Sequence, residues 1–150
     1  MSAEPIDMSE FDFRMRRPGG VLARFVESIW YARGTVPYQR EQIAPTGSCV
    51  AVFVLGPPIR EAPLGAAMQS FERGFLIGPH ERPVVNEPTG ETHAVGIVCT
   101  TVGATPVLGV DPNGVKRRVV DLESAWPAAM ALRAALATAS EPDHMLGLVE

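Results

Sequence analysis

Short apolar stretches, separated by glycine and proline, fill the first two thirds of the chain. Their two-residue alternation and turn-bounded lengths predict β-strands over residues 24–33, 38–44, 49–55, 71–77, 83–86 and 91–101. Within the first strand, the alternation places Val26, Ser28 and Trp30 on one face. The third strand, CVAVFVL, is apolar throughout, which is typical of a strand buried on both faces. We expect six or more mainly antiparallel strands between residues 24 and 101, with a loop over residues 56–70.

The pattern changes after residue 101, where helical spacing replaces alternation. A short helix is predicted over residues 104–110, and the alanine-rich segment WPAAMALRAALATA predicts a longer one over residues 126–139. Ser140 resembles the N-cap of a last helix, and the chain ends about two turns into it, a length that is marginal alone. We therefore expect the chain to be truncated before a further domain. Strands first and helices last predict a mainly β fold, α+β overall: an antiparallel β-barrel or sandwich followed by C-terminal helices.

Composition narrows the class of protein. The chain has 150 residues, which fits one domain, and a net charge of −4. The densest basic run, residues 116–118, is followed closely by Asp121 and Glu123, so we expect no binding of duplex DNA by this chain. The N-terminus has no apolar core of signal-peptide type, and no stretch is long enough to span a bilayer. A cytoplasmic protein without membrane contact is expected, with Cys49 and Cys99 buried, unreactive and unpaired.

Candidate catalytic and metal-binding residues form no recognised pattern. His80, His93 and His144 lack the spacing of metal ligands, and no serine lies in a Gly-x-Ser-x-Gly elbow. No glycine-rich loop between a strand and a helix offers a phosphate cradle. We therefore predict no metal, no cofactor and no catalytic residue, so the protein is not expected to be an enzyme. The loop Gly78–Val84 carries His80 between two predicted strands, and the sequence allows either a ligand contact or a plain surface hairpin there.

The order and spacing of several segments are more specific than any one of them. ESIWYARG (27–34), RE (40–41), IAPTGSCVAVFVLG (43–56), IGPHERPVV (77–85), PTGETHAVGI (88–97) and RVVDLESAW (118–126) occur in sequence. Together they resemble the N-terminal domain of a group of AraC-type transcription regulators. The resemblance implies a cupin-like barrel that senses a small molecule or mediates homodimerisation. In that family a helix-turn-helix domain normally follows, so DNA contact is expected only through that missing C-terminal domain.

This resemblance divides the chain into three parts. Residues 1–23 are expected to form a loose N-terminal arm, residues 24–101 the β-barrel sensor core, and residues 102–150 a helical appendage or linker. Family members tend to have polar residues where Val50 and Val54 stand here, which makes this face almost wholly apolar. The pocket is therefore expected to suit an apolar effector, or to be filled by side chains.

A candidate effector site follows from these expectations. We place it inside the barrel, on strands that are expected to face each other across one core, with His80 and His93 as polar contacts and an apolar lining of Trp30, Val50, Val52, Val54 and Phe75. The alternative is that the lining is ordinary core. At the level of function, the alternatives are a cupin-like small-molecule enzyme and a purely structural dimerisation module with a filled barrel. The sequence does not identify the effector.

Overall fold

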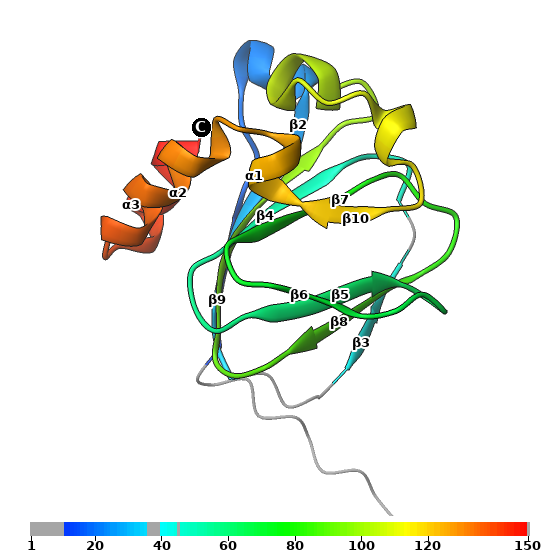
Figure 1. Ribbon diagram of the computed structural model, residues 1–150. Coiled ribbons are helices and arrows are strands. Elements are labelled where there is room, and N and C mark those ends of the chain that lie inside the picture. Colours follow the sequence, from blue (N-terminus) through cyan, green and yellow to red (C-terminus); the bar gives the residue numbers. More distant parts are fainter. Residues whose placement is uncertain (1–10, 36–39, 45, 150) are drawn as a thin grey trace, which may run out of the picture.

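Two antiparallel β-sheets face each other, and helices cover the outer face of one of them (Figure 1). The structure is a computed structural model, and it describes residues 11–35, 40–44 and 46–149. The large sheet has six strands, in the order β1 (Asp12–Arg16), β2 (Val26–Gly34), β9 (Thr92–Cys99), β4 (Val50–Val54), β7 (Gly74–Ile77) and β10 (Val119–Asp121). The small sheet has four, in the order β3 (Glu41–Ile43), β8 (Val84–Pro88), β5 (Ile59–Pro63) and β6 (Gln69–Phe71).

The centre of the large sheet is buried on both faces, and this explains why the sequence of β4 is continuously apolar. This strand lies between β9 and β7. Ala51 and Phe53 point to the helices, where they join the outer core, whereas Val52 and Val54 belong to a second core between the sheets. A strand with protein on both sides has no position for a solvated side chain. The prediction of a doubly buried strand is confirmed.

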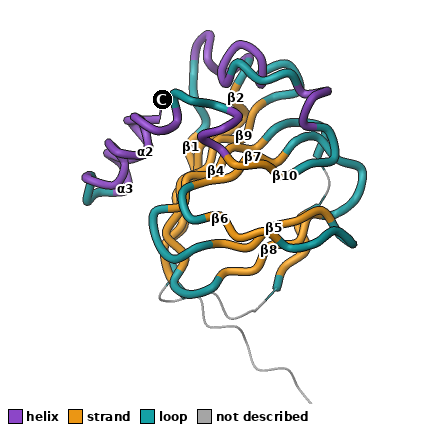
Figure 2. The backbone as a smooth tube through the Cα atoms, viewed as in Figure 1, coloured by secondary structure: helices purple, strands orange, loops and turns teal. Residues whose placement is uncertain are grey.

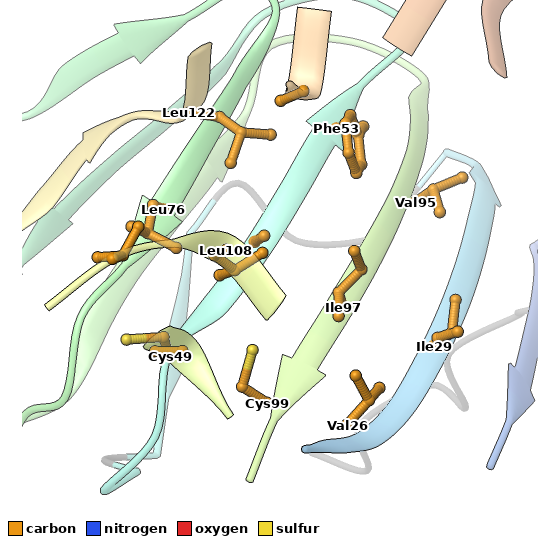
Figure 3. Close-up of a cluster of buried hydrophobic side chains, with 14 of the residues drawn as sticks. Val26, Ile29, Cys49, Phe53, Leu76, Val95, Ile97, Cys99, Leu108 and Leu122 are labelled. Carbon is orange, nitrogen blue, oxygen red and sulfur yellow. The ribbon is translucent and has the colours of Figure 1, made fainter. Parts of the chain in front are cut away.

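Short helices and turns close the outer face of the large sheet. Three of them, η1 (Gly20–Arg24), η2 (Ala104–Leu108) and η3 (Pro112–Val115), lie near one end of the strands, and η2 is a single turn of π-helix. They are followed by α1 (Leu122–Ala125), α2 (Ala129–Thr138) and α3 (Pro142–Val149). Figure 3 shows the resulting outer core, in which the strand residues Phe53, Leu76 and Ile97 meet Leu108 and Leu122.

Polar contacts fix two of the C-terminal helices. The Asp121 carboxylate caps α1 by accepting a hydrogen bond from the backbone N–H of Ser124 at 3.0 Å. The guanidinium of Arg133, on α2, donates to the carbonyl oxygen of Val54 from Nη2 at 2.9 Å and from Nε at 3.1 Å. It also donates to the carbonyl of Arg73 at 3.1 Å. These bonds hold α2 against the ends of β4 and β7.

The predicted fold class is confirmed. Among the described residues, eight strands (β2 to β9) lie between residues 24 and 101, all their pairings are antiparallel, and helices follow them. The layers visible in Figure 2 form a sandwich of two sheets. The predicted helices over residues 104–110 and 126–139 appear as η2 and α2, and the last one as α3.

Three expectations about local structure need correction. Residues 12–16 of the expected loose arm form β1, because they complete the edge of the large sheet beside β2. The expected loop over residues 56–70 contains β5 and β6, which pair with each other and with β8. A bulge between Val26 and Ser28 turns Val26 to the helices, away from the face of Trp30. Residues 1–10 of the arm and residues 38 and 39 of the second predicted strand lie outside the described residues.

Candidate functional site

A cavity of about 480 Å³ lies between the two sheets. Its floor is one row of residues that runs across the large sheet. In this row Trp30 is opposite Gly96, Gly96 is opposite Val52, and Val52 is opposite Phe75. The residues around the cavity are Phe11, Phe13, Trp30, Ala32, Glu41, Ile43, Val50, Val52, Ile59, Phe75, Ile77, Asn86, Thr92, Ala94 and Val98. The lining is thus mostly aromatic and aliphatic, with a few polar groups.

The absence of a side chain at Gly96 lets the Trp30 ring lie flat on the floor. A Cβ atom at position 96 would be 2.1 Å from Cε2 of Trp30, which is far inside van der Waals contact. On the other side of the indole, Phe13 of β1 stacks with a centroid separation of 6.3 Å and an angle of 25° between the planes. Trp30 is therefore held between the backbone of β9 and a ring from the edge strand.

The opposite wall, formed by the small sheet, carries a row of polar side chains. Glu41 of β3 is opposite Asn86 of β8, Asn86 is opposite Glu61 of β5, and Glu61 is opposite Gln69 of β6. Glu41 and Asn86 line the cavity, together with Ile59, which is two residues before Glu61 and on the same face of β5. Glu61 and Gln69 line a second hollow of about 370 Å³ beside the β10 segment. We call Glu41, Asn86 and Glu61 the acidic row.

Glu61 is the most unusual member of the acidic row. Its side chain is 0 % exposed, and neither carboxyl oxygen has a hydrogen-bond partner among the described residues. Burial raises the pKa of this carboxyl to about 9, and the negative charge of Glu41 adds to the effect. At neutral pH Glu61 is therefore protonated, and its unused hydrogen-bonding group lies at the second hollow, beside the β10 segment.

The predicted effector residues separate into two groups. The cavity brings together Trp30, Val50, Val52 and Phe75. Their strands lie in one sheet, so these residues share one wall and do not face each other across the core. Val54 belongs to the same core but is 0 % exposed and lies outside the cavity lining.

The two histidines lie away from the cavity. His93 is on the outer face of β9, where its ring meets Tyr31 edge to face at 5.8 Å. His80 is buried in the loop between β7 and β8, and its backbone N–H donates to the carbonyl of Thr46 at 3.0 Å. Burial lowers the pKa of both imidazoles, so both are neutral at pH 7. Neither histidine is placed to contact a molecule bound between the sheets.

Sequence reasoning predicted the segments of β3 and β8 as strands but missed β5 and β6, the other half of the small sheet. The segment IREAP, residues 59–63, alternates in a way that puts Ile59 and Glu61 on one side of a strand and Arg60 on the other. The prolines around it favoured a loop, but they stand at the end of the strand and just before it. Recognising β5 would have shown that an acidic residue shares a face with buried apolar positions.

The charged loop between β7 and β8 is tied down by ion pairs. Arg117 Nη2 donates to both carboxylate oxygens of Glu81, at 2.9 and 3.0 Å. The backbone N–H of Arg117 donates to the carbonyl of Pro79 at 2.8 Å, and its φ of 60° is in the left-handed region. These contacts join the loop to the segment before β10, which supports a structural role for Glu81.

Cys49 and Cys99 lie side by side, and the prediction that both thiols are buried is confirmed. The backbone N–H of Cys99 donates to the carbonyl of Cys49 at 3.0 Å, and both side chains face the outer core (Figure 3). Burial raises the pKa of the Cys49 thiol. The pKa of Cys99 rises to about 12 through burial and the neighbouring Cys49. A protonated, inaccessible thiol is a poor nucleophile.

Metal ligands and membrane spans are not found in the part of the chain that the structure describes. No three His, Cys, Asp or Glu side chains there converge in a way that could hold a metal ion. None of the helices there has the length and apolar character needed to span a bilayer.

Sequence comparison assigns the chain to a family. A family model described as "Domain of unknown function (DUF6597)" matches residues 14–121, from within β1 to the end of β10. This chain belongs to the DUF6597 family. The DUF6597 segment therefore contains both sheets and the cavity lining from Trp30 to Val98, and α1, α2 and α3 follow it. No curated protein matches the chain.

Among solved structures, the chain is similar to an RmlC-like cupin protein from Desulfovibrio desulfuricans. The sequences are 13 % identical, the TM-score is 0.41, and the match covers 66 % of this chain and 91 % of the other. The chain is also similar to vicilin from hazelnut, Corylus avellana. There the identity is 12 %, the TM-score is 0.40, and the match covers 81 % of this chain and 49 % of the other.

Proposed function

We propose that this chain is the small-molecule-sensing and dimerisation domain of a cytoplasmic AraC-type transcription regulator. The cavity between the sheets carries the proposal. Its volume of about 480 Å³ lies within the usual range of small-molecule sites, and its apolar lining with a few polar groups has their usual make-up. The sequence resemblance to AraC-type N-terminal domains supplies the regulatory context.

The cavity favours sensing over a purely structural role. Protein interiors are close-packed and leave few voids larger than a water molecule. A module that only dimerises has no reason to keep Trp30 and Phe75 beside an unfilled space. The polar groups that line the space are the Glu41 carboxyl, the Asn86 amide and the Thr92 hydroxyl, which suit hydrogen bonds to a ligand. We therefore propose binding without chemical conversion.

The fold offers a route from the cavity to the C-terminal helices. Val52 lines the cavity, and the next residue on β4, Phe53, points to the outer face and packs against Trp126 at a ring separation of 6.0 Å. Similarly, Phe75 lines the cavity while Leu76 packs in the outer core with Leu122 of α1. A ligand that shifts β4 or β7 thus acts directly on the segment that leads toward the DNA-binding domain of the proposed regulator.

Thermal-shift screening tests the sensing function. A ligand at 100 times its Kd stabilises a protein by about 2.7 kcal/mol, which raises Tm by about 5–10 °C for a domain of this size. The screen uses neutral, cationic and anionic metabolites of drug-like size. Hits should be lost in Val50→Phe, which fills the cavity, and kept in Glu72→Gln, an exposed substitution. A broad screen without any hit that depends on Val50 would contradict the sensing function.

Dimerisation is tested separately, by analytical ultracentrifugation of the chain at micromolar concentration. We expect a homodimer. A monomer at all concentrations, with and without a hit from the screen, would remove dimerisation from the proposal and leave ligand sensing intact.

A further inference from the structure

We propose that the ligand of the inter-sheet cavity is an uncharged, flat aromatic molecule with an amide-type edge, whose neighbouring N–H and carbonyl groups are recognised by the side chain of Asn86. The inference rests on the proposed sensing function and specifies the class of effector. It goes beyond that function because an apolar cavity does not by itself select a charge or a hydrogen-bonding pattern.

Small side chains on the floor leave part of the free space in the cavity. Two packed sheets lie about 10 Å apart, and side chains from both normally fill this distance. Ala32 of β2 is opposite Ala94 of β9, and both line the cavity. In the next row, the Trp30 ring occupies the place of a side chain at Gly96. Part of the space therefore lies over the two alanines, beside the indole ring.

Asn86 lies on the small sheet at the same depth as these alanines. Strand β8 ends at Pro88 and β9 begins at Thr92, so a short turn joins the two sheets there. Asn86 is two residues before the end of β8, and Ala94 is two residues after the start of β9. Both residues line the cavity. A ligand group over the alanine row thus comes next to the Asn86 side chain.

The side-chain amide of Asn86 is available to a ligand. Its side chain makes no hydrogen bond to the described residues, whereas its backbone lies in the sheet between β3 and β5. The amide has two N–H donors and one carbonyl acceptor. A carboxamide or a lactam presents the complementary pair, a carbonyl next to an N–H. Such a ligand can make two parallel hydrogen bonds with Asn86, and a ligand with a lone carbonyl can make one.

The charges around the cavity favour an uncharged ligand. The described lining contains no Lys, Arg or His, so an anion would find no partner of opposite charge there. Glu41, the acidic residue in this lining, already interacts within the protein, and we assign it no contact with the ligand. An ion that enters an apolar cavity without a partner loses its hydration at a large cost.

The aromatic side chains of the lining favour a flat aromatic body. The Trp30 ring is held between Gly96 and Phe13, so a bound molecule meets mainly the edge of the indole. Phe75 lies in the same row of the large sheet. Edge-to-face contacts between aromatic rings are favourable at centroid separations of about 4.5–7 Å. A ring system between the sheets can make such contacts with the floor.

The cavity reaches the molecular surface between β1 and β3, the two strands at one edge of the sandwich. Phe13 of β1 and Ile43 of β3 both line the cavity, and they are 55 % and 37 % exposed. A ligand can therefore enter past these two side chains without opening the sheets.

The experiment compares four probes of nearly the same size: 2-naphthamide, 2-acetonaphthone, 2-naphthoate and 2-naphthylmethylamine. They carry an amide, a lone carbonyl acceptor, a negative charge and a positive charge on one aromatic body. Isothermal titration calorimetry at pH 7 gives the four affinities. The amide should bind at least about 10-fold more tightly than the ketone, because it makes one more hydrogen bond. The two ions should bind more weakly than the amide by at least the same factor.

Two variants and one control assign the effect to Asn86. Asn86→Leu keeps the approximate size of the side chain and should weaken amide binding at least about 10-fold, while ketone binding changes less than about threefold. Asn86→Ser should act in the same direction and keeps the test valid if Asn86→Leu does not fold. Gln42→Leu removes an exposed amide of β3 that does not line the cavity, and it should leave all four affinities unchanged.

The outcomes separate the ligand class from the sensing function. A carboxylate or an amine that binds as tightly as the amide would overturn the uncharged class, and an equally tight ketone would overturn the amide-type edge. In each case the cavity would remain a binding site. Absence of amide binding at millimolar concentration would also overturn the inference, and the library screen would then decide sensing independently. Unchanged amide binding in both Asn86→Leu and Asn86→Ser would show that Asn86 is not the anchor.

Discussion

The buried carboxyl of Glu61 makes the stability of this protein depend on pH in an unusual direction. Most carboxylates in folded proteins have a lowered pKa and stabilise the fold as pH rises. Glu61 does the reverse, because burial raises its pKa from 4.5 to about 9. Between these two values the folded state holds a proton that the unfolded state has lost, so the free energy of unfolding decreases as pH increases.

The size of this effect follows from the two pKa values. Inside the window from 4.5 to about 9, each pH unit removes about 1.36 kcal/mol from the free energy of unfolding. From pH 5.5 to 7.5 the loss is therefore about 3 kcal/mol. Glu61→Gln removes the titrating group and nearly keeps the side-chain shape.

Urea unfolding, followed by circular dichroism at pH 5.5, 6.5 and 7.5, measures the effect. The free energy of unfolding of the variant minus that of the wild type should rise by about 3 kcal/mol from the lowest to the highest pH. This difference cancels the other titrating groups, including His80 and His93. Burial lowers the pKa of these imidazoles, so they favour folding as pH rises and act in the opposite direction. A difference that stays constant within about 0.5 kcal/mol would refute the reasoning, and Glu72→Gln should give that flat result.

Other substitutions probe the packing around the cavity and the thiols. Val54→Phe should overpack the core and lower the free energy of unfolding by about 1–3 kcal/mol in urea. Val50→Phe should keep its Tm, because the larger ring extends into the cavity. Equal losses of stability in the two variants would contradict this map of the cavity. Gly96→Ala should displace the Trp30 ring, cost about 1–3 kcal/mol and change the tryptophan emission, and an unchanged spectrum would argue against their contact. Cys99, whose pKa is raised to about 12, should react with a thiol reagent only after unfolding, and rapid labelling of the native protein would disprove its burial.

The sequence by itself determined the class of fold and the four central strands of the large sheet, β2, β9, β4 and β7. A run such as CVAVFVL has no solvated position, which is typical of a strand covered on both faces, and β4 is one. The phase of alternation also assigned Val50 and Val52 to one face, which proved to be the cavity face. These inferences succeed because they depend on neighbouring residues and on the fixed periods of strands and helices.

Other features depend on contacts between residues far apart in the chain. The sequence predicted that residues 12–16 belong to a charged arm. They form β1 because they pair with the edge of β2 and because Phe13 stacks on the Trp30 ring. Likewise, Val26 changes face because a bulge interrupts the pairing with β9. Alternation along one strand contains no information about its partner or about a break in register.

The cavity itself was decided only by the tertiary structure. Val50, Val52 and Val54 have the same side chain on the same face, yet two line the cavity and the third is in closed core. In the same way, Glu61 is an ordinary acidic residue in the sequence. It becomes buried, gains its raised pKa and comes to lie beside Asn86 only when β5 and β8 pair and the second sheet closes over the first. The reason is that burial depends on the packing of distant segments and not on local residue pattern.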